Sequence, residues 1–189
     1  MKKIIKLLAL ILTLSIFTSS LFSCNMSPED ENEEVENEST ENSLKVGNKI
    51  GNLCITTNLE LVFGGSVNVK DYLGKKVVIN FWGTWCGPCK NELPHFDEVA
   101  EEYSDSVVIL TVHSTDGIED APSYITDNFS SSKMVFAIDK ANDGYYRALN
   151  PGQNSYPITI ILDEQGVIRY KTVGAISKNT LTNEINKIK

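Results

Sequence analysis

The sequence is poor in residues that bind metals or heme. It has four cysteines and two histidines among 189 residues, and it contains no heme-attachment motif. Cys86 and Cys89 are separated by two residues and could supply half of the ligands of a zinc site. No second C-x-x-C and no H-x-x-x-H is present to supply the other half. A metal-binding module would therefore have to take its other ligands from Cys54, His95 or His113.

An excess of basic charge is also absent. The chain has 17 lysines and arginines against 25 acids, a formal net charge of −8. The first 43 residues hold eight of the acids and three of the lysines, so residues 44–189 keep 17 acids and 14 bases, a net of −3. Neither balance favours nucleic-acid binding. No internal repeat is present, and the stretch after residue 43 has the size of one domain.

The chain lacks an apolar run suited to a membrane span, but it begins with a shorter one. Three lysines among the first six residues precede an apolar run over 7–22, which is the pattern of a secretory signal. The residues LFSC then end at Cys24 and resemble the lipobox of bacterial lipoproteins. We therefore expect a lipoprotein-type signal peptide over 1–23 and a lipid anchor at Cys24, which would hold the protein on the outer face of the cytoplasmic membrane. The alternative is ordinary signal cleavage nearby and a free Cys24.

Residues 24–43 contain no basic residue and one aliphatic side chain, whereas eight are acidic. Such a segment cannot bury enough apolar surface to offset the entropy of ordering it. We expect an acidic disordered tether, and an acidic tail that binds a partner is the alternative.

The remainder, 44–189, alternates between strand and helix patterns. Near-continuous apolar runs predict buried strands, and apolar residues at helical spacing predict the helices between them. The predicted order is strand 76–82, helix 86–103, strand 106–113, helix 118–129, strand 133–139 and helix 145–149. This alternation predicts an α/β fold with a central mixed sheet covered on both faces.

Hairpins are predicted at both ends of this domain. Residues 54–69 contain short β-rich pieces around a Gly64-Gly65 turn. Near the C-terminus, strands over 157–163 and 167–174 are followed by a helix from Ser177 to Lys189.

The stretch WCGPCK places Cys86 where a buried strand breaks and a helix begins. Free backbone N–H groups and the helix dipole favour a negative group there, and a thiolate is such a group. Pro88 suits the first helical turn. Cys89 follows one turn later, close enough to form a small disulfide ring. We expect Cys86 to be the exposed, activated thiol and Cys89 the recessed one, a spacing that suits thiol–disulfide exchange.

FWGTWCGPCK, with Pro94 and with Tyr156-Pro157 before a strand, resembles the thioredoxin fold and, within it, the TlpA/ResA-like thiol–disulfide oxidoreductases. The resemblance covers about residues 46–189. It implies a thioredoxin-like (redoxin) domain over 44–189, a three-layer sandwich with an added N-terminal β-hairpin. It also implies that Pro157 follows a cis peptide bond and packs against the disulfide.

The resemblance further implies an extracytoplasmic reductase of protein disulfides that uses neither a cofactor nor a metal. It implies two groups of site residues, catalytic Cys86, Cys89 and Pro157, and substrate-binding Trp85, Gly87, Pro88 and Tyr156. The implied partners are client proteins with disulfides and a membrane thiol reductant of the CcdA/DsbD type, and the implied state is a monomer.

One position departs from the thioredoxin pattern. Thioredoxins carry a buried acid six residues before the first cysteine, and here that residue is Asn80. TlpA/ResA-like reductases can use an acid from the loop after the next strand, and Asp116 is the candidate for assisting Cys89. Asp116 as a turn residue or a helix N-cap is the alternative.

Other reactive residues have simpler interpretations. His113 is expected to be a satisfied structural histidine rather than a base. Cys54 is expected to be a small buried hydrophobe, although the sequence leaves open its pairing with Cys86 or Cys89. A peroxiredoxin-like peroxidase is a second alternative function, but the P-x-x-x-T-x-x-C setting of peroxidatic cysteines does not occur.

Overall fold

The computed structural model describes residues 44–140 and 142–189. The predicted signal peptide, the Cys24 anchor and the acidic tether lie outside these ranges. Within them, no helix is both long enough and apolar enough to cross a bilayer.

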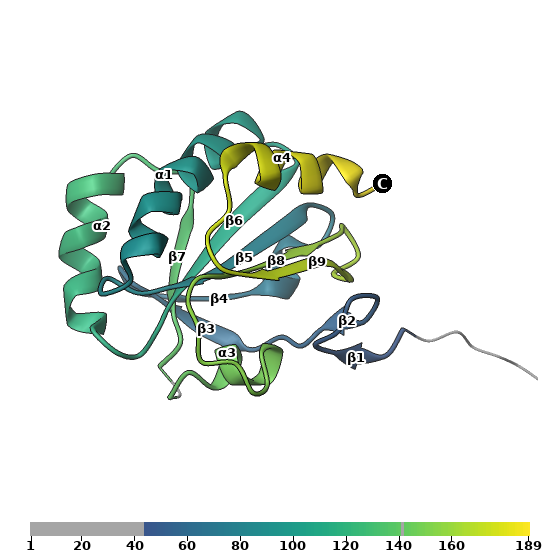
Figure 1. The fold of residues 1–189 in the computed structure, drawn as a ribbon, viewed down its shortest axis with the longest axis horizontal. Helices are drawn as coiled ribbons and strands as arrows, with labels where there is room; N and C mark the ends of the chain where they lie inside the picture. The colour runs from purple at the N-terminus through teal and green to yellow at the C-terminus, as the bar shows by residue number, and fades with distance from the viewer. Residues whose placement is uncertain (1–43, 141) are drawn as a thin grey trace, which may run out of the picture. The chain divides into compact units, whose positions relative to one another are not determined.

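A mixed sheet forms the centre of the domain (Figure 1). In the part of the chain that the structure describes, this sheet is seven-stranded, with the order β4-β3-β7-β6-β5-β8-β9. Its strands are β3 (Asn58–Leu61), β4 (Ser66–Asn68), β5 (Lys76–Trp82), β6 (Val107–His113), β7 (Val135–Ile138), β8 (Ile158–Leu162) and β9 (Ile168–Val173). The three central strands β5, β6 and β7 are parallel, and β3 and β8 pair with them in the antiparallel sense.

The burial of β5 on both faces follows from its sequence. Val78 and Trp82 face one apolar cluster, whereas Ile79 and Phe81 face the other. Because side chains alternate along a strand, a run that must fill two cores is apolar at almost every position. Apart from Lys76 at its start, the exception is Asn80, which is fully buried.

Helices cover both faces of the sheet, as predicted. The helices α1 (Gly87–Glu102), α2 (Ala121–Phe129) and α4 (Lys178–Lys187) contribute to one cluster, and α3 (Gly144–Leu149) contributes to the other. Figure 1 shows α1 and α4 above the sheet, α2 at its left beside α1, and α3 below it. Two short 3₁₀ segments, η1 (Val69–Tyr72) and η2 (Ile118–Asp120), complete the connections.

The predicted N-terminal hairpin is confirmed. Strands β3 and β4 pair antiparallel, and Gly64 and Gly65 in the turn have φ values of 95° and 92°, which glycine adopts at no steric cost. A small parallel pair, β1 (Val46–Gly47) with β2 (Leu53–Cys54), was not predicted. Strands of two residues are too short to show an alternating pattern.

Candidate active site

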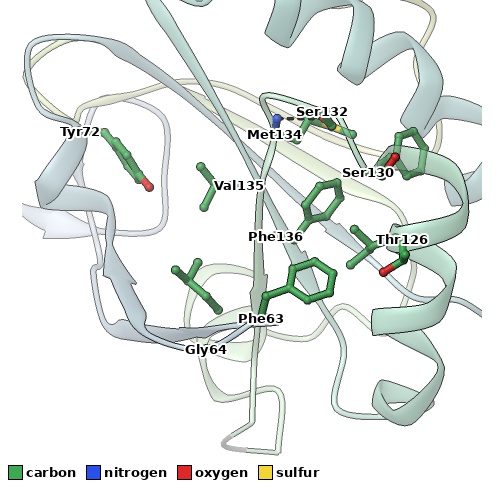
Figure 2. A pocket seen from close by; sticks show the side chains of 12 residues that line it. Phe63, Gly64, Tyr72, Thr126, Ser130, Ser132, Met134, Val135 and Phe136 are labelled. Carbon is green, nitrogen blue, oxygen red and sulfur yellow. Dashed lines mark hydrogen bonds between the residues drawn. The ribbon is translucent and has the colours of Figure 1, made fainter.

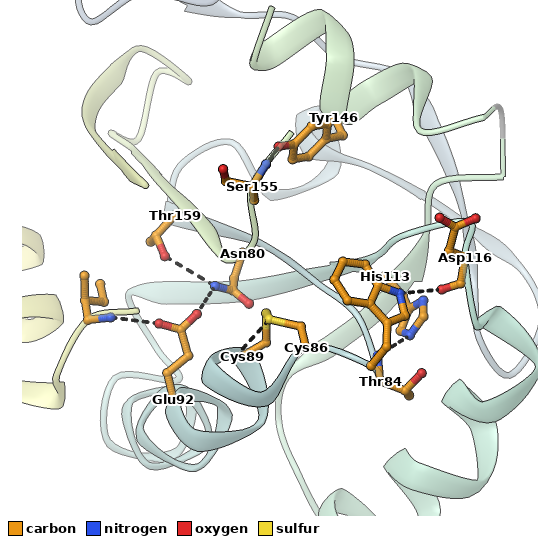
Figure 3. The surroundings of a disulfide bond; sticks show 12 residues. Asn80, Thr84, Cys86, Cys89, Glu92, His113, Asp116, Tyr146, Ser155 and Thr159 are labelled. Atoms are coloured by element: carbon orange, nitrogen blue, oxygen red, sulfur yellow. Dashed lines mark hydrogen bonds between the residues drawn. A yellow bond between two sulfur atoms is a disulfide. The ribbon is translucent and has the colours of Figure 1, made fainter. Parts of the chain in front are cut away.

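Cys86 and Cys89 form a disulfide at the start of α1 (Figure 3). Their sulfur atoms are 1.98 Å apart and their Cα atoms 5.3 Å apart. Cys86 is the N-cap of the helix, and its Sγ accepts a hydrogen bond from the backbone N–H of Cys89 at 3.2 Å. Pro88 lies in the first turn, where its missing N–H costs no helical bond. The strand–turn–helix order thus places the first sulfur against free backbone donors and the positive end of the helix dipole.

The two sulfurs differ in access, although less than expected. Cys86 retains 5% of its accessible surface and Cys89 retains none. The order agrees with the prediction, but the expectation of an openly exposed Cys86 was wrong in degree. Because the disulfide draws the Cys86 sulfur toward the buried Cys89, only a small part of the Cys86 residue is open to a partner.

Trp85 forms the rim of this opening. Its side chain is 52% exposed, and its Nε1–H donates to the backbone oxygen of Asp116 at 3.0 Å. The indole lies against two glycines, since a Cβ at Gly83 would come within 2.7 Å of the ring and one at Gly117 within 3.1 Å. Glycine at these positions therefore lets Trp85 lie close to the backbone beside the disulfide.

A second aromatic side chain extends this rim. Tyr156 contacts Trp85 edge to face, with ring centroids 5.2 Å apart, and stacks on Tyr146 at 4.7 Å. Burial raises the pKa of Tyr156, which therefore stays neutral. The Tyr156–Pro157 peptide bond is cis, as the resemblance implies. We call Trp85, Tyr156 and Tyr146 the aromatic rim.

A buried acid that was not predicted lies on the other side of the disulfide. Glu92 follows Cys89 by three residues on α1 and is 2% exposed. Its Oε1 accepts from Asn80 Nδ2 at 2.8 Å, and its Oε2 accepts from the backbone N–H of Ile176 at 2.9 Å. Figure 3 shows Glu92 and Asn80 on the Cys89 side.

Burial raises the pKa of Glu92 to about 7, although the hydrogen bonds from Ile176 and Asn80 oppose the shift. A carboxyl group with this pKa can accept and release a proton at neutral pH. Asn80, which cannot titrate, donates to both Glu92 and Thr159. The acid absent from the strand is therefore present on the helix. The spacing i, i+3 from Cys89 was the available signal, because such residues share a helix face.

Asp116 occupies a different environment. It is exposed, and it contacts Trp85 through its backbone oxygen rather than its carboxylate. In Figure 3 its carboxylate does not point toward the disulfide. The structure thus brings Glu92, and not the Asp116 carboxylate, to the buried side of Cys89.

Cys54 lies in the apolar cluster on the opposite face of the sheet from Cys86 and Cys89. Burial raises the pKa of its thiol to about 11, so it is almost entirely protonated at neutral pH. Cys86 and Cys89 are joined to each other, so Cys54 has no disulfide partner among the residues that the structure describes.

A large groove in the described part of the chain lies away from the disulfide (Figure 2). It has a volume of about 590 Å³ and is lined by the β3–β4 turn, the C-terminal half of α2 and β7, including Phe63, Phe129 and Phe136. No predicted site residue within the described ranges lines it. Among residues 44–140 and 142–189, no three His, Cys, Asp or Glu side chains are grouped so that they could hold a metal ion.

A sheet of this topology, with a C-x-x-C disulfide at a helix N-terminus and a cis-proline, defines the thioredoxin-like thiol–disulfide oxidoreductases. The comparison with known families agrees. Residues 46–171 match the AhpC/TSA family, and the chain belongs to that family.

Named relatives place the chain among the oxidoreductases of this fold. It is 30% identical to the thioredoxin-like protein YneN of Bacillus subtilis over 75% of this chain and 82% of the relative. It is 31% identical to the thiol–disulfide oxidoreductase ResA of Bacillus cereus over 77% of this chain and 79% of the relative. Among solved structures, the exposed lipoprotein thioredoxin Etrx1 of Streptococcus pneumoniae matches with a TM-score of 0.61 and 26% identity, over 71% of this chain and all of that one. The chain is a thiol–disulfide oxidoreductase.

Proposed function

We propose that this oxidoreductase works outside the cytoplasm as a reductase of protein disulfides, with Cys86 and Cys89 as its redox pair. The observation that carries the proposal is the Cys86 sulfur, which caps α1 and accepts the Cys89 N–H. The same contacts stabilise a thiolate at that position once the disulfide is reduced.

The first step is attack on the client. The Cys86 thiolate attacks one sulfur of a client disulfide, and the other client sulfur leaves as a thiolate that takes up a proton. A mixed disulfide between Cys86 and the client results. Trp85 and Tyr156 of the aromatic rim, together with Gly87 and Pro88, supply the surface that the client covers.

The second step releases the client. Cys89 loses its proton, attacks the Cys86 sulfur and forms the Cys86–Cys89 disulfide, while the second client sulfur leaves as a thiolate and is protonated. The client is reduced by two electrons and the enzyme is oxidised by two. We assign Glu92, in its carboxylate form, as the group that takes the Cys89 proton, and Asp116 as the weaker candidate for this role.

The cellular setting is proposed from the N-terminal sequence and from the relatives. The lipobox-like Cys24 and the similarity to Etrx1, an exposed lipoprotein, support a lipid-anchored protein on the outer face of the membrane. A reductase there needs electrons from inside, and a membrane thiol reductant of the CcdA/DsbD type would supply them to a monomeric domain. Labelling with a radioactive fatty acid tests the anchor. The mature wild-type protein should carry the label, and a Cys24→Ala variant should carry none.

The redox potential of the Cys86–Cys89 pair tests the direction of the reaction. Gly-Pro between the cysteines is shared with thioredoxin, whose reduction potential is about −270 mV. The oxidant DsbA has a reduction potential of about −120 mV. Equilibration of the purified domain with glutathione should give a value on the thioredoxin side. A potential above about −180 mV would contradict a reductase.

Two other functions are separated by direct assays. A peroxidase would consume hydrogen peroxide with dithiothreitol as the reductant, and we expect no consumption above that of a Cys86→Ser control. A zinc or copper module would retain metal through purification, and we expect no stoichiometric metal in the oxidised or the reduced protein.

A further inference from the structure

The turn that precedes Cys86 is tied to the loop after β6. Thr84 Oγ1 donates to the backbone oxygen of Gly117 at 3.1 Å, and Trp85 Nε1 donates to that of Asp116 at 3.0 Å. A third bond comes from the Thr84 backbone N–H, which donates to His113 Nε2 at 2.9 Å. This last acceptor is a side chain that titrates, whereas the other two are carbonyl oxygens.

The surroundings of His113 fix which ring nitrogen carries the proton. His113 is fully buried at the end of β6. Its Nδ1 lies 2.6 Å from the backbone oxygen of Ser114, which can only accept, so Nδ1 carries the proton. Nε2 therefore presents a lone pair, and the Thr84 N–H uses it. The neutral imidazole satisfies both of its nitrogens in this one tautomer.

The ring is also held in place by packing. Trp82 contacts it edge to face with centroids 4.7 Å apart, and the Ser114 N–H donates to the Trp82 carbonyl at 2.9 Å. Trp82 pairs with His113 in the parallel register of β5 and β6. The imidazole therefore cannot turn away from Thr84 without disturbing the ends of both strands, and its position sets that of the turn leading to Cys86.

We propose that His113 is a positioning residue, whose neutral Nε2 holds the Thr84 N–H and thereby the turn that carries Trp85 and Cys86. Protonation at Nε2 replaces the acceptor with a donor, so the bond is lost and the turn loosens. The exchange reactivity of Cys86 should then fall reversibly in acid. The inference rests on the proposed role of Cys86 as the attacking thiol.

Several charged groups near the imidazole influence its pKa. Asp143 at the start of α3, and Asp120 and Glu119 in η2, favour the charged ring. Asp139 follows β7 and donates its backbone N–H to the His113 carbonyl at 3.0 Å. A Cys86 thiolate at the start of α1 would add a negative charge in the reduced enzyme. Burial outweighs the hydrogen bond to the Ser114 backbone oxygen and the neighbouring acids in the oxidised protein, and it lowers the pKa of His113 below its ordinary 6.5. The bond is therefore present at neutral pH and is lost below that ordinary value.

The first test needs no substitution at His113. Amide hydrogen exchange of the isotope-labelled wild-type domain reports on the Thr84 N–H. The rate is expressed as a protection factor, which corrects for the effect of pH on the intrinsic exchange rate. We expect protection at neutral pH and its loss in parallel with the titration of the His113 ring resonances. A His95→Leu variant, which removes the other histidine, should behave as wild type. Thr84 protection that does not follow the His113 titration would overturn the proposal.

Two variants then separate positioning from packing. His113→Gln keeps an acceptor that does not titrate, and His113→Leu removes the acceptor at similar volume. Alkylation of Cys86 by iodoacetamide at neutral pH should be about five- to tenfold slower in His113→Leu, a change that corresponds to the loss of one hydrogen bond. In His113→Gln the rate should stay within about twofold of wild type. The acid-induced loss of Thr84 protection should be absent in His113→Gln.

The outcomes distinguish this inference from the proposed function. Equal alkylation rates in wild type, His113→Leu and His113→Gln would contradict positioning by His113, even if the protein reduces disulfides. A wild-type protein that fails to reduce insulin would contradict the proposed function, whereas the Thr84 exchange data would still test His113. If His113→Leu does not fold, the wild-type titration and His113→Gln decide.

Discussion

The disulfide has a buried side and an open side, and an acid of each side can be compared, Glu92 behind Cys89 and Asp116 beside Trp85. Behind Cys89, Glu92 is 2% exposed and accepts hydrogen bonds from Asn80 and from the backbone of Ile176. On the open side, Asp116 is exposed and contacts Trp85 only through its main chain. Burial gives Glu92 a pKa of about 7, which suits it to proton transfer. A carboxyl group thus acquires this capacity from its surroundings and not from its place in the sequence.

The largest expected effect separates the two sulfurs. Cys86→Ser should abolish insulin reduction and form no client adduct, because the attacking thiol is lost. Cys89→Ser should also abolish turnover but should accumulate mixed disulfides on Cys86, because the resolving thiol is lost. Non-reducing electrophoresis with mass spectrometry of the trapped peptides measures both. If Cys86→Ser traps adducts and Cys89→Ser does not, the two roles are reversed.

The next largest effect should separate Glu92 from Asp116 in the rate of insulin reduction. Glu92→Gln should slow insulin reduction at neutral pH about 100-fold, the size expected of a lost general base. Wild-type activity should rise with pH through about 7 as the pKa of Glu92 is passed and its carboxylate forms, and this rise should be missing in the variant. Asp116→Asn is the matched control and should change the rate by no more than about twofold. A larger loss in Asp116→Asn than in Glu92→Gln would place the base on the open side.

Glu92 should also leave a signature in stability. The pKa of Glu92 in the folded protein, about 7, lies above the ordinary 4.5. Its contribution to the free energy of unfolding is therefore fully present below about pH 4.5 and is lost as the pH rises through 7. The free energy of unfolding of wild type should therefore fall by on the order of 1–3 kcal/mol across this window relative to Glu92→Gln. Urea titrations at a series of pH values measure the difference. Identical pH slopes in the two proteins would mean that Glu92 is not desolvated.

The smallest effect concerns the aromatic rim. Trp85→Ala should raise the KM for insulin about three- to fivefold with little change in kcat, because the indole offers contact area and no chemistry. Leu73 is 51% exposed, nearly the same as Trp85, but lies outside the site, so Leu73→Ala should leave the KM unchanged. Equal effects of the two substitutions would remove Trp85 from the client surface.

The fold was predictable where the chain is long and periodic. Strand β5 and helix α1 were found because their apolar positions recur over seven and sixteen residues. The pair β1–β2 was missed because two-residue strands have no period. The Cys86–Cys89 disulfide at the start of α1 was predictable because the spacing of the two cysteines and their place at a helix start are local features.

The burial of Glu92 could not be predicted by the same means, although its spacing from Cys89 places it on the same helix face. An acid on an amphipathic helix is usually solvated, and nothing near Glu92 in the sequence shows that it is buried. Its hydrogen bonds come from Asn80, twelve residues earlier, and from Ile176, eighty-four residues later. Such long-range contacts are set by the packing of α1 against the sheet and the segment before α4.

The reactivity proposed for this protein depends on a thiolate at Cys86 that the end of α1 stabilises. Its most direct test is the pH dependence of Cys86 alkylation in the reduced domain, followed by mass spectrometry so that Cys54 and Cys89 are counted separately. We predict an apparent pKa clearly below the value of about 8.5 that is found for a free cysteine. A Cys86 thiol that ionises at about 8.5 would contradict stabilisation by the helix.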